Sequence, residues 1–395
     1  ETTLLMSVLL LSLLTHSSSE PPPFTVAAYL PEWRFDSANY ERICRTVNML
    51  IFFSIEVHGN GTLAALDRLP RLSLVREARP HCKRMLLCVG GNGRSGGFSA
   101  AVSSRKSRRR FISALLRLCE KAGFDGVDYN WEYPGFAFGS GYKSEDDVAR
   151  DYHGLQYLLI ETREAFAPSG RVVTLAYYPD RKQERMLGLM SEHVDAMHAM
   201  AHRPRHTRDT PRHCSLPGTA RTAQNLGRLR ACRHRPSPPV PQAYDQSGRH
   251  STYAFAEKVA AQAVELLPPS KVTLGLPFYG RHLQTGDWKS YEDLMKPEDF
   301  PDGPSASLEA DEAGGYYYNG PWTIARKVRL AASHGLQGVM VWEAGQDCRE
   351  APVWRHGKVA HVQTCPEQGP GASLLSAIRG ALPPSSEGAG PHDEL

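Results

Sequence analysis

Residues 124–135 read FDGVDYNWEYPG, and this stretch decides the fold prediction. Asp128, Asn130 and Glu132 occupy every second position of a run that is otherwise apolar and aromatic. Alternate side chains of a β-strand point to the same face, so these three would line one side while the apolar residues between them pack on the other. Three polar groups on one face of an apolar strand are costly to bury without a purpose. The stretch therefore predicts a reactive row on a strand.

The same stretch resembles the signature of glycoside hydrolase family 18, the chitinase family. The family pattern is D-G-x-D-x-D-W-E followed by Y-P, a motif long enough to be specific. The positions that match are Asp125, Gly126, Asp128, Trp131, Glu132, Tyr133 and Pro134. Asn130 departs from the pattern, because the family has Asp at that position.

Short apolar strands alternate with helical stretches along most of the chain. Eight candidate strands are residues 25–30, 47–55, 84–89, 123–133, 171–178, 194–201 rejoined at Tyr244, 271–279 and 337–343. Helices are predicted over residues 107–122 and 148–167. Eight βα units predict an α/β fold, a (β/α)8 TIM barrel that forms a single catalytic domain over residues 24–382. Many members of the family carry an α+β insertion after the seventh strand, and we expect it here to be short or absent.

Residues 202–243 do not have the character of the rest of the chain. They contain nine Arg, seven Pro, four His and one acidic residue, with almost no apolar periodicity. Without them the net charge would be −4 in place of +4, so the basicity indicates no nucleic-acid partner. The Pro-rich end at Gln242 is what a pyrimidine tract and a CAG acceptor would encode. We interpret the segment as a translated retained intron.

Two alternatives for residues 202–243 stay open. One is a basic insertion without fixed structure, since the composition provides little core. The other is a metal site that uses His213, Cys214, Cys232 and His234, although their spacing is not that of a standard zinc site. No metal or other cofactor is predicted elsewhere.

The two ends of the chain predict a resident of the endoplasmic reticulum lumen. Residues 1–19 have the apolar run and small polar residues of a signal peptide, and the run is too short to span a membrane. The tail, residues 383–395, ends in HDEL, which a retrieval receptor recognises. That compartment permits disulfides, and Cys348 with Cys365 is the favoured pair. Asn60 begins the one glycosylation sequon, Asn60-Gly61-Thr62.

The resemblance assigns chemistry to the strand ends. It implies that Glu132 protonates the leaving oxygen while the acetamido group of the substrate attacks its own anomeric carbon. Asn130 can still accept the acetamide N–H, but it has no charge and cannot share a proton with Asp128. Tyr244 matches the family residue that binds the acetamide oxygen, with a core aromatic as the alternative reading.

Further residues match positions that line the cleft of the family. Trp342 matches the indole on which the sugar next to the scissile bond stacks. The remaining candidates for substrate binding are Tyr29, Phe53, Gly91, Tyr133, Met200, Asp245, Tyr279 and Arg281. Cys88 stands where the family has a Ser that supports Asp128.

Two functions from different classes follow. The first is a chitinase-like hydrolase that cleaves β-1,4-linked N-acetylglucosamine in chitin, chito-oligosaccharides or N-glycan cores, slowed by Asn130. The second is a catalytically silent chitin or glycan lectin on the same barrel. Glu132 favours the enzyme and Asn130 favours the lectin. Residues 91–96 also fit the dinucleotide pattern G-x-G-x-x-G, but no ribose-binding acid follows at the right distance.

Overall fold

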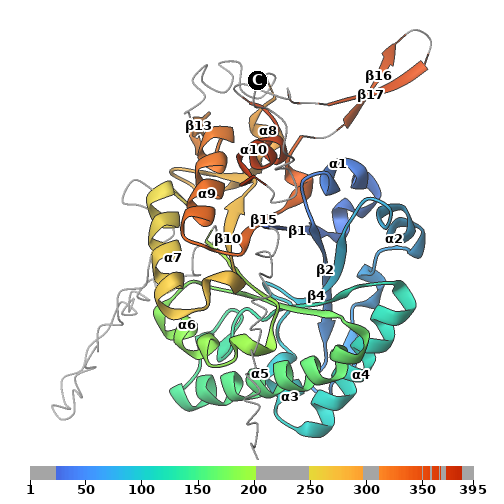
Figure 1. The fold of residues 1–395 in the computed structure, drawn as a ribbon, viewed down its shortest axis with the longest axis vertical. Helices are drawn as coiled ribbons and strands as arrows, with labels where there is room; N and C mark the ends of the chain where they lie inside the picture. The colour runs from blue at the N-terminus through green and yellow to red at the C-terminus, as the bar shows by residue number, and fades with distance from the viewer. Residues whose placement is uncertain are drawn as a thin grey trace, which may run out of the picture. The chain divides into compact units, whose positions relative to one another are not determined.

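Eight parallel strands close into a barrel in this computed structural model (Figure 1). The structure describes residues 24–201, 249–296, 311–348, 350–355, 358–363, 365 and 371–384. The barrel strands are β1 (Thr25–Pro31), β2 (Met49–Val57), β4 (Arg84–Gly90), β5 (Gly126–Asn130), β8 (Val172–Tyr177), β9 (Ala196–Ala199), β10 (Val272–Pro277) and β15 (Gly338–Trp342). Strand β1 pairs with both β2 and β15, which closes the ring. The predicted (β/α)8 barrel is confirmed.

Helices cover the outside of the barrel (Figure 1). They are α1 (Tyr40–Cys44), α2 (Leu72–Ala78), α3 (Phe98–Val102), α4 (Arg105–Ala122), α5 (Glu145–Phe166), α6 (Arg181–Gly188), α7 (Tyr253–Leu266), α8 (Tyr291–Leu294), α9 (Pro321–Ser333) and α10 (Leu374–Ala381). Short strands outside the barrel are β3 (Leu63–Ala64), the pair β6 (Phe136–Ala137) and β7 (Gly141–Tyr142), and the hairpin of β16 (Glu350–Arg355) and β17 (Lys358–Gln363). Within the described ranges no helix is long and apolar enough to cross a membrane.

Side chains along each barrel strand point alternately outward to the helices and inward to the barrel, and this produces two cores. One set of buried side chains packs between the strands and the helices, and a second, smaller set fills the barrel interior. On β5, Val127 and Tyr129 belong to the outer set, and the Tyr129 hydroxyl lies 2.8 Å from Oγ1 of Thr162 on α5. The residues between them, Asp128 and Asn130, therefore point into the barrel, as the alternation predicted.

A small antiparallel sheet follows the seventh barrel strand. It contains β11 (Tyr279–His282), β12 (Trp288–Ser290), β13 (Glu312–Ala313) and β14 (Tyr316–Tyr317), in the order β12-β11-β14-β13. Helix α8 directly follows β12. The insertion predicted to be short or absent is thus present in a short form.

The described part of the sixth barrel strand is β9, and the predicted continuation at Tyr244 lies outside the described residues. Strand β9 pairs with β8 and β10, and the chain returns to the described region at Arg249. The Ser251 hydroxyl donates to the backbone oxygen of Ala201 (3.0 Å). The buried amine of Lys327 donates to the Ser251 carbonyl (2.5 Å) and to Oδ1 of Asn319 (2.6 Å). These bonds fasten the two described ends of the segment to each other and to α9.

Two disulfides secure the barrel. Cys348–Cys365 was predicted and is confirmed, while Cys44–Cys82, which joins α1 to the end of the α2 segment, was not assigned from the sequence. Of the other four cysteines, Cys88 and Cys119 are buried and free, and two lie outside the described residues.

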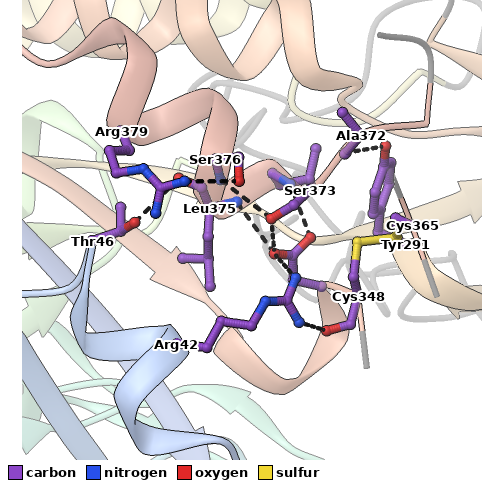
Figure 2. A network of polar contacts seen from close by, with 12 residues as sticks. Arg42, Thr46, Tyr291, Cys348, Cys365, Ala372, Ser373, Leu375, Ser376 and Arg379 are labelled. Carbon is purple, nitrogen blue, oxygen red and sulfur yellow. Dashed lines mark hydrogen bonds and ion pairs between the residues drawn. A yellow bond between two sulfur atoms is a disulfide. The ribbon is translucent and has the colours of Figure 1, made fainter. Parts of the chain in front are cut away.

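A polar network holds α10 against the first helix, close to the Cys348–Cys365 disulfide (Figure 2). The buried carboxylate of Asp347 accepts hydrogen bonds from the Ser373 hydroxyl (2.6 Å) and the Leu374 N–H (2.8 Å), both at the start of α10. Nη2 of Arg42, on α1, lies 3.7 Å from the same carboxylate. Burial raises the pKa of Asp347, and these donors and the guanidinium oppose the rise. The network therefore connects α1, near the start of the barrel domain, to α10, near its end.

Candidate active site

Asp128 lies at the centre of a buried polar cluster inside the barrel. Its carboxylate has no exposed surface and accepts hydrogen bonds from the Tyr29 hydroxyl (2.9 Å) and the Thr174 hydroxyl (2.7 Å). Cys88 is the neighbour of Asp128 across β4 and β5, and its side chain belongs to the interior cluster. Burial, together with the negative charge of Asp128, raises the pKa of both Tyr29 and Cys88 well above their usual values. Both groups are therefore neutral, and neither adds a charge beside Asp128.

Asn130 presents a buried oxygen that no described residue uses. The residue is 2% exposed, and its Oδ1 accepts no hydrogen bond within the described part of the chain. Its backbone oxygen accepts from the Gly91 N–H (2.7 Å), which fixes the strand end. A buried acceptor without a donor is costly, and such atoms in functional clefts are commonly satisfied by a ligand.

Gly91 is required by close packing at this strand end. Its φ of +111° lies in the region that favours glycine, and an added Cβ would lie 2.4 Å from the Phe53 ring. Phe53 in turn packs edge-on against Trp342, with ring centroids 4.8 Å apart. Gly91 and Phe53 thus support the indole from behind.

Glu132 completes the inward row beyond the end of β5. Its side chain is 5% exposed and borders the cleft, and its backbone N–H donates to the Ser95 hydroxyl (3.0 Å). Ser95 lies in the glycine-rich loop after β4 and also donates to the Gly91 carbonyl (3.0 Å). The loop that resembles a dinucleotide site therefore serves to position the backbone of Glu132.

A cleft of about 430 Å³ opens beside this row. Seven predicted site residues line it: Tyr29, Asn130, Glu132, Met200, Tyr279, Arg281 and Trp342. Four other predicted site residues do not line the cleft. Asp128, Phe53 and Gly91 lie behind its wall, as described above, and Tyr133 packs in the interior cluster. Tyr244 and Asp245 lie outside the described residues.

Sequence reasoning missed five residues of the cleft: Trp33, Trp288, Met340, Glu343 and Gln346. Trp33 and Trp288 are 56% and 57% exposed, which is unusual for indoles. Trp33 lies two residues after the end of β1. Because residues that follow barrel strands border the active site in this fold, its position in the sequence could have identified it. Glu343 is buried and accepts a hydrogen bond from Nε of Arg34 (3.2 Å).

The cleft combines stacking surfaces with the carboxyl groups of Glu132 and Glu343 at its wall. Flat apolar rings suit the faces of sugar rings, and the inward row supplies polar groups at the base. In the part of the chain that the structure describes, no cluster of His, Cys, Asp or Glu could hold a metal ion. The four residues of the alternative metal site lie outside that part.

Comparison with known proteins identifies the family. The model of glycosyl hydrolases family 18 matches residues 25–347. The chain belongs to this family. It is 24% identical over 318 residues to "Probable chitinase 2" of Drosophila melanogaster, covering 70% of this chain and 58% of that protein. It is 23% identical over 381 residues to "Endochitinase 1" of Metarhizium robertsii, covering 82% of each.

Solved structures agree on the fold. A Group IV chitinase of Ostrinia furnacalis in complex with allosamidin superimposes with a TM-score of 0.61 at 18% identity, over 90% of this chain and 98% of that one. A chitinase from Bacteroides thetaiotaomicron gives a TM-score of 0.63 at 18% identity, over 94% and 100%. The chain is therefore a chitinase-like member of glycoside hydrolase family 18, built on the family barrel.

Proposed function

We propose that this protein hydrolyses β-1,4-linked N-acetylglucosamine in chitin-type oligosaccharides or N-glycan cores. The observation that carries the proposal is the inward row of β5, where the buried, unpartnered Oδ1 of Asn130 lies two residues from Glu132 on the wall of the cleft. An acetamide N–H is a suitable donor for that oxygen. The sugar ring would stack on Trp342.

The mechanism is substrate-assisted. The acetamide oxygen of the sugar forms a bond to C1, and the glycosidic C1–O bond breaks as Glu132 gives its proton to the leaving oxygen. Asn130 accepts the acetamide N–H and orients the attacking carbonyl. Water then adds to C1 as the bond between C1 and the acetamide oxygen breaks, and it loses a proton to Glu132, which restores the acid and the acetamido group and yields the product with retained configuration. Asp128 contributes the negative charge behind Asn130.

The alternative is a lectin on the same barrel, which binds these sugars without turnover. Asn130 favours it, because the amide provides no charge to stabilise the positive oxazolinium intermediate. The two functions separate in one assay: release of fluorophore from a chitotrioside, beside calorimetric binding of unlabelled chitotriose. Four proteins are compared: the parent and Glu132→Gln, and the same two proteins with residues 202–243 deleted. Binding by the parent with a rate equal to that of Glu132→Gln would establish the lectin.

We further propose that the protein resides in the endoplasmic reticulum lumen, with residues 1–19 as a signal peptide and the HDEL tail recognised by a retrieval receptor. The two disulfides support an oxidising compartment. Asn60 supports it too, because it is exposed and its Oδ1 accepts from the Thr62 N–H (3.0 Å) and hydroxyl (2.7 Å), an ordered sequon. Endoglycosidase H should increase the gel mobility of the parent and not of Asn60→Gln. Parent protein that never acquires a glycan would contradict the location.

We also propose that residues 202–243 come from a retained intron. The hydrogen bond that joins Ser251 to Ala201 supports this, since the barrel closes around the segment without needing it. Sequencing the transcript decides the matter. A mature message in which these codons are constitutive would contradict the proposal.

A further inference from the structure

His198 lies beside Asp128 inside the barrel. The side chain has no exposed surface, and its Nε2 lies 3.8 Å from Oδ1 of Asp128. Its Nδ1 lies 2.8 Å from the hydroxyl of Thr273 on β10, and the ring meets Tyr29 edge-on with centroids 6.1 Å apart. Contacts from β1 and β10 thus hold the imidazole in one orientation, with Nε2 toward the carboxylate.

Asp128 has no lysine or arginine partner among the described residues. His198 is the one basic side chain there that comes near its carboxylate, with Nε2 3.8 Å from Oδ1. The other groups that face the pair are hydroxyls, a thiol and one carboxyl group: Tyr29, Thr174, Thr273, Cys88 and Glu132. In this chain Asn130 cannot take up or release a proton, and the imidazole is the one basic group that adds to the two hydroxyl donors at the Asp128 carboxylate.

The carboxylate beside Nε2 favours the tautomer with the proton on that nitrogen. Burial lowers the pKa of His198, and Asp128 opposes this in part, so the ring is neutral and has a single N–H. The Thr273 hydroxyl can donate to Nδ1, which leaves the N–H on Nε2. That N–H faces Asp128, whose carboxylate already accepts from Tyr29 and Thr174. At 3.8 Å the contact is longer than a hydrogen bond, and Nε2 makes no hydrogen bond within the described residues, so its N–H acts on the carboxylate as a nearby dipole.

We propose that His198 is a positioning residue that keeps Asp128 ionised, and that Asp128 thereby supplies the negative charge that the amide of Asn130 lacks. The inference rests on the proposed hydrolytic function. The positive intermediate would be stabilised through Asn130 by the charge of Asp128 behind it. Protonation of Asp128 at low pH would remove that charge and slow turnover, so His198 sets the acid side of the pH–rate profile.

The kinetic test compares His198→Leu, which removes the N–H and the ring nitrogens, with His198→Gln, which retains an amide donor. We expect kcat of His198→Leu to fall about tenfold further at pH 5 than at pH 8 relative to the parent, a shift of about one pH unit in the acid limb. His198→Gln should recover most of this, with KM changed less than kcat. A purely packing role would lower kcat of His198→Leu equally at every pH, and that result would overturn the proposal.

A second measurement is independent of turnover and needs no variant to fold. Nitrogen-15 NMR of the parent identifies the protonated nitrogen of His198, and carbon-13 NMR follows the carboxyl group of Asp128. We expect the neutral tautomer with the proton on Nε2 and an ionised Asp128 from pH 5 to pH 8. A proton on Nδ1, or a neutral Asp128 in this range, overturns the inference even if the protein is a lectin. Absence of turnover with the expected spectra overturns the proposed hydrolysis alone.

Discussion

Asn130→Asp should convert a slow enzyme into a faster one. In the structure the amide oxygen is buried, unpartnered and adjacent in the row to the carboxyl group of Glu132. The parent already offers an acceptor for the acetamide N–H, so the substitution adds only the charge. A hydrogen bond to a charged group contributes about 1.5–3 kcal/mol and a neutral one about 0.5–1.5 kcal/mol, a difference of roughly 1–1.5 kcal/mol.

That difference gives about a tenfold gain in kcat as the lower limit. A preorganised charge that acts on the intermediate in a water-poor site can contribute about 3–4 kcal/mol, so roughly 10³-fold is the upper limit. The second buried carboxylate beside Asp128 opposes part of the gain, because the two charges repel and one takes up a proton more readily. We therefore expect a gain between these limits.

The assay measures kcat and KM with the fluorogenic chitotrioside, and the urea midpoint of unfolding for each variant. Asn130→Ala is the matched control, since it removes the acceptor and should lower kcat below that of the parent. Glu132→Gln gives the background rate. The electrostatic reasoning is refuted if Asn130→Asp folds as stably as the parent and hydrolyses the substrate no faster.

Three other outcomes are expected. Burial raises the pKa of Glu184 from 4.5 to about 7, so the native state binds its proton more tightly than the unfolded state. The stability that this group contributes is therefore present below pH 4.5 and is lost as pH rises through 7. The free energy of unfolding of the parent, measured with urea, should fall by about 3 kcal/mol between pH 4.5 and pH 8, and that of Glu184→Gln should not show this fall. The hydrogen bond between Ser251 and Ala201 closes a loop of 49 residues, and deletion of residues 202–243 shortens that loop to seven residues. Because a shorter loop costs less entropy to close, the free energy of unfolding should rise by about 1.7 kcal/mol, measured as a higher urea midpoint. A variant that fails to fold would contradict this. Trp342→Ala should weaken chitotriose binding about fivefold in calorimetry, since an aromatic contact contributes roughly 1 kcal/mol, whereas Trp322→Ala, on the outer helix α9, should leave it unchanged.

The barrel was predictable because each strand has a strong local signature. A strand occurs in each of the eight predicted ranges, with the continuation of the sixth at Tyr244 outside the described residues, since buried apolar runs of this length have few other uses. Helix starts were less well predicted. Helix α4 begins at Arg105 and α5 at Glu145, two and three residues before the predictions, because Ser104 and Ser144 cap the first turns and the apolar periodicity begins only later.

The site was predictable where it lies on strands and less so elsewhere. The row on β5 and Trp342 on β15 follow from alternation and from the motif. Trp288 was missed because it lies in the small sheet, whose position depends on tertiary packing. The Cys44–Cys82 disulfide was missed for the same reason, since spacing along the chain does not give the distance between α1 and the segment after α2.

The joint made by Ala201, Ser251 and Lys327 also bears on how the gene can change. Because hydrogen bonds and a buried amine bring strand and helix together there, the covalent connection is not what holds them in place. A circular permutant with new termini at this joint should fold to the same barrel. On the same reasoning, coding sequence gained or lost at this point should leave the rest of the barrel intact, and alternative splicing here would give products that share one fold and differ in what borders the sixth strand.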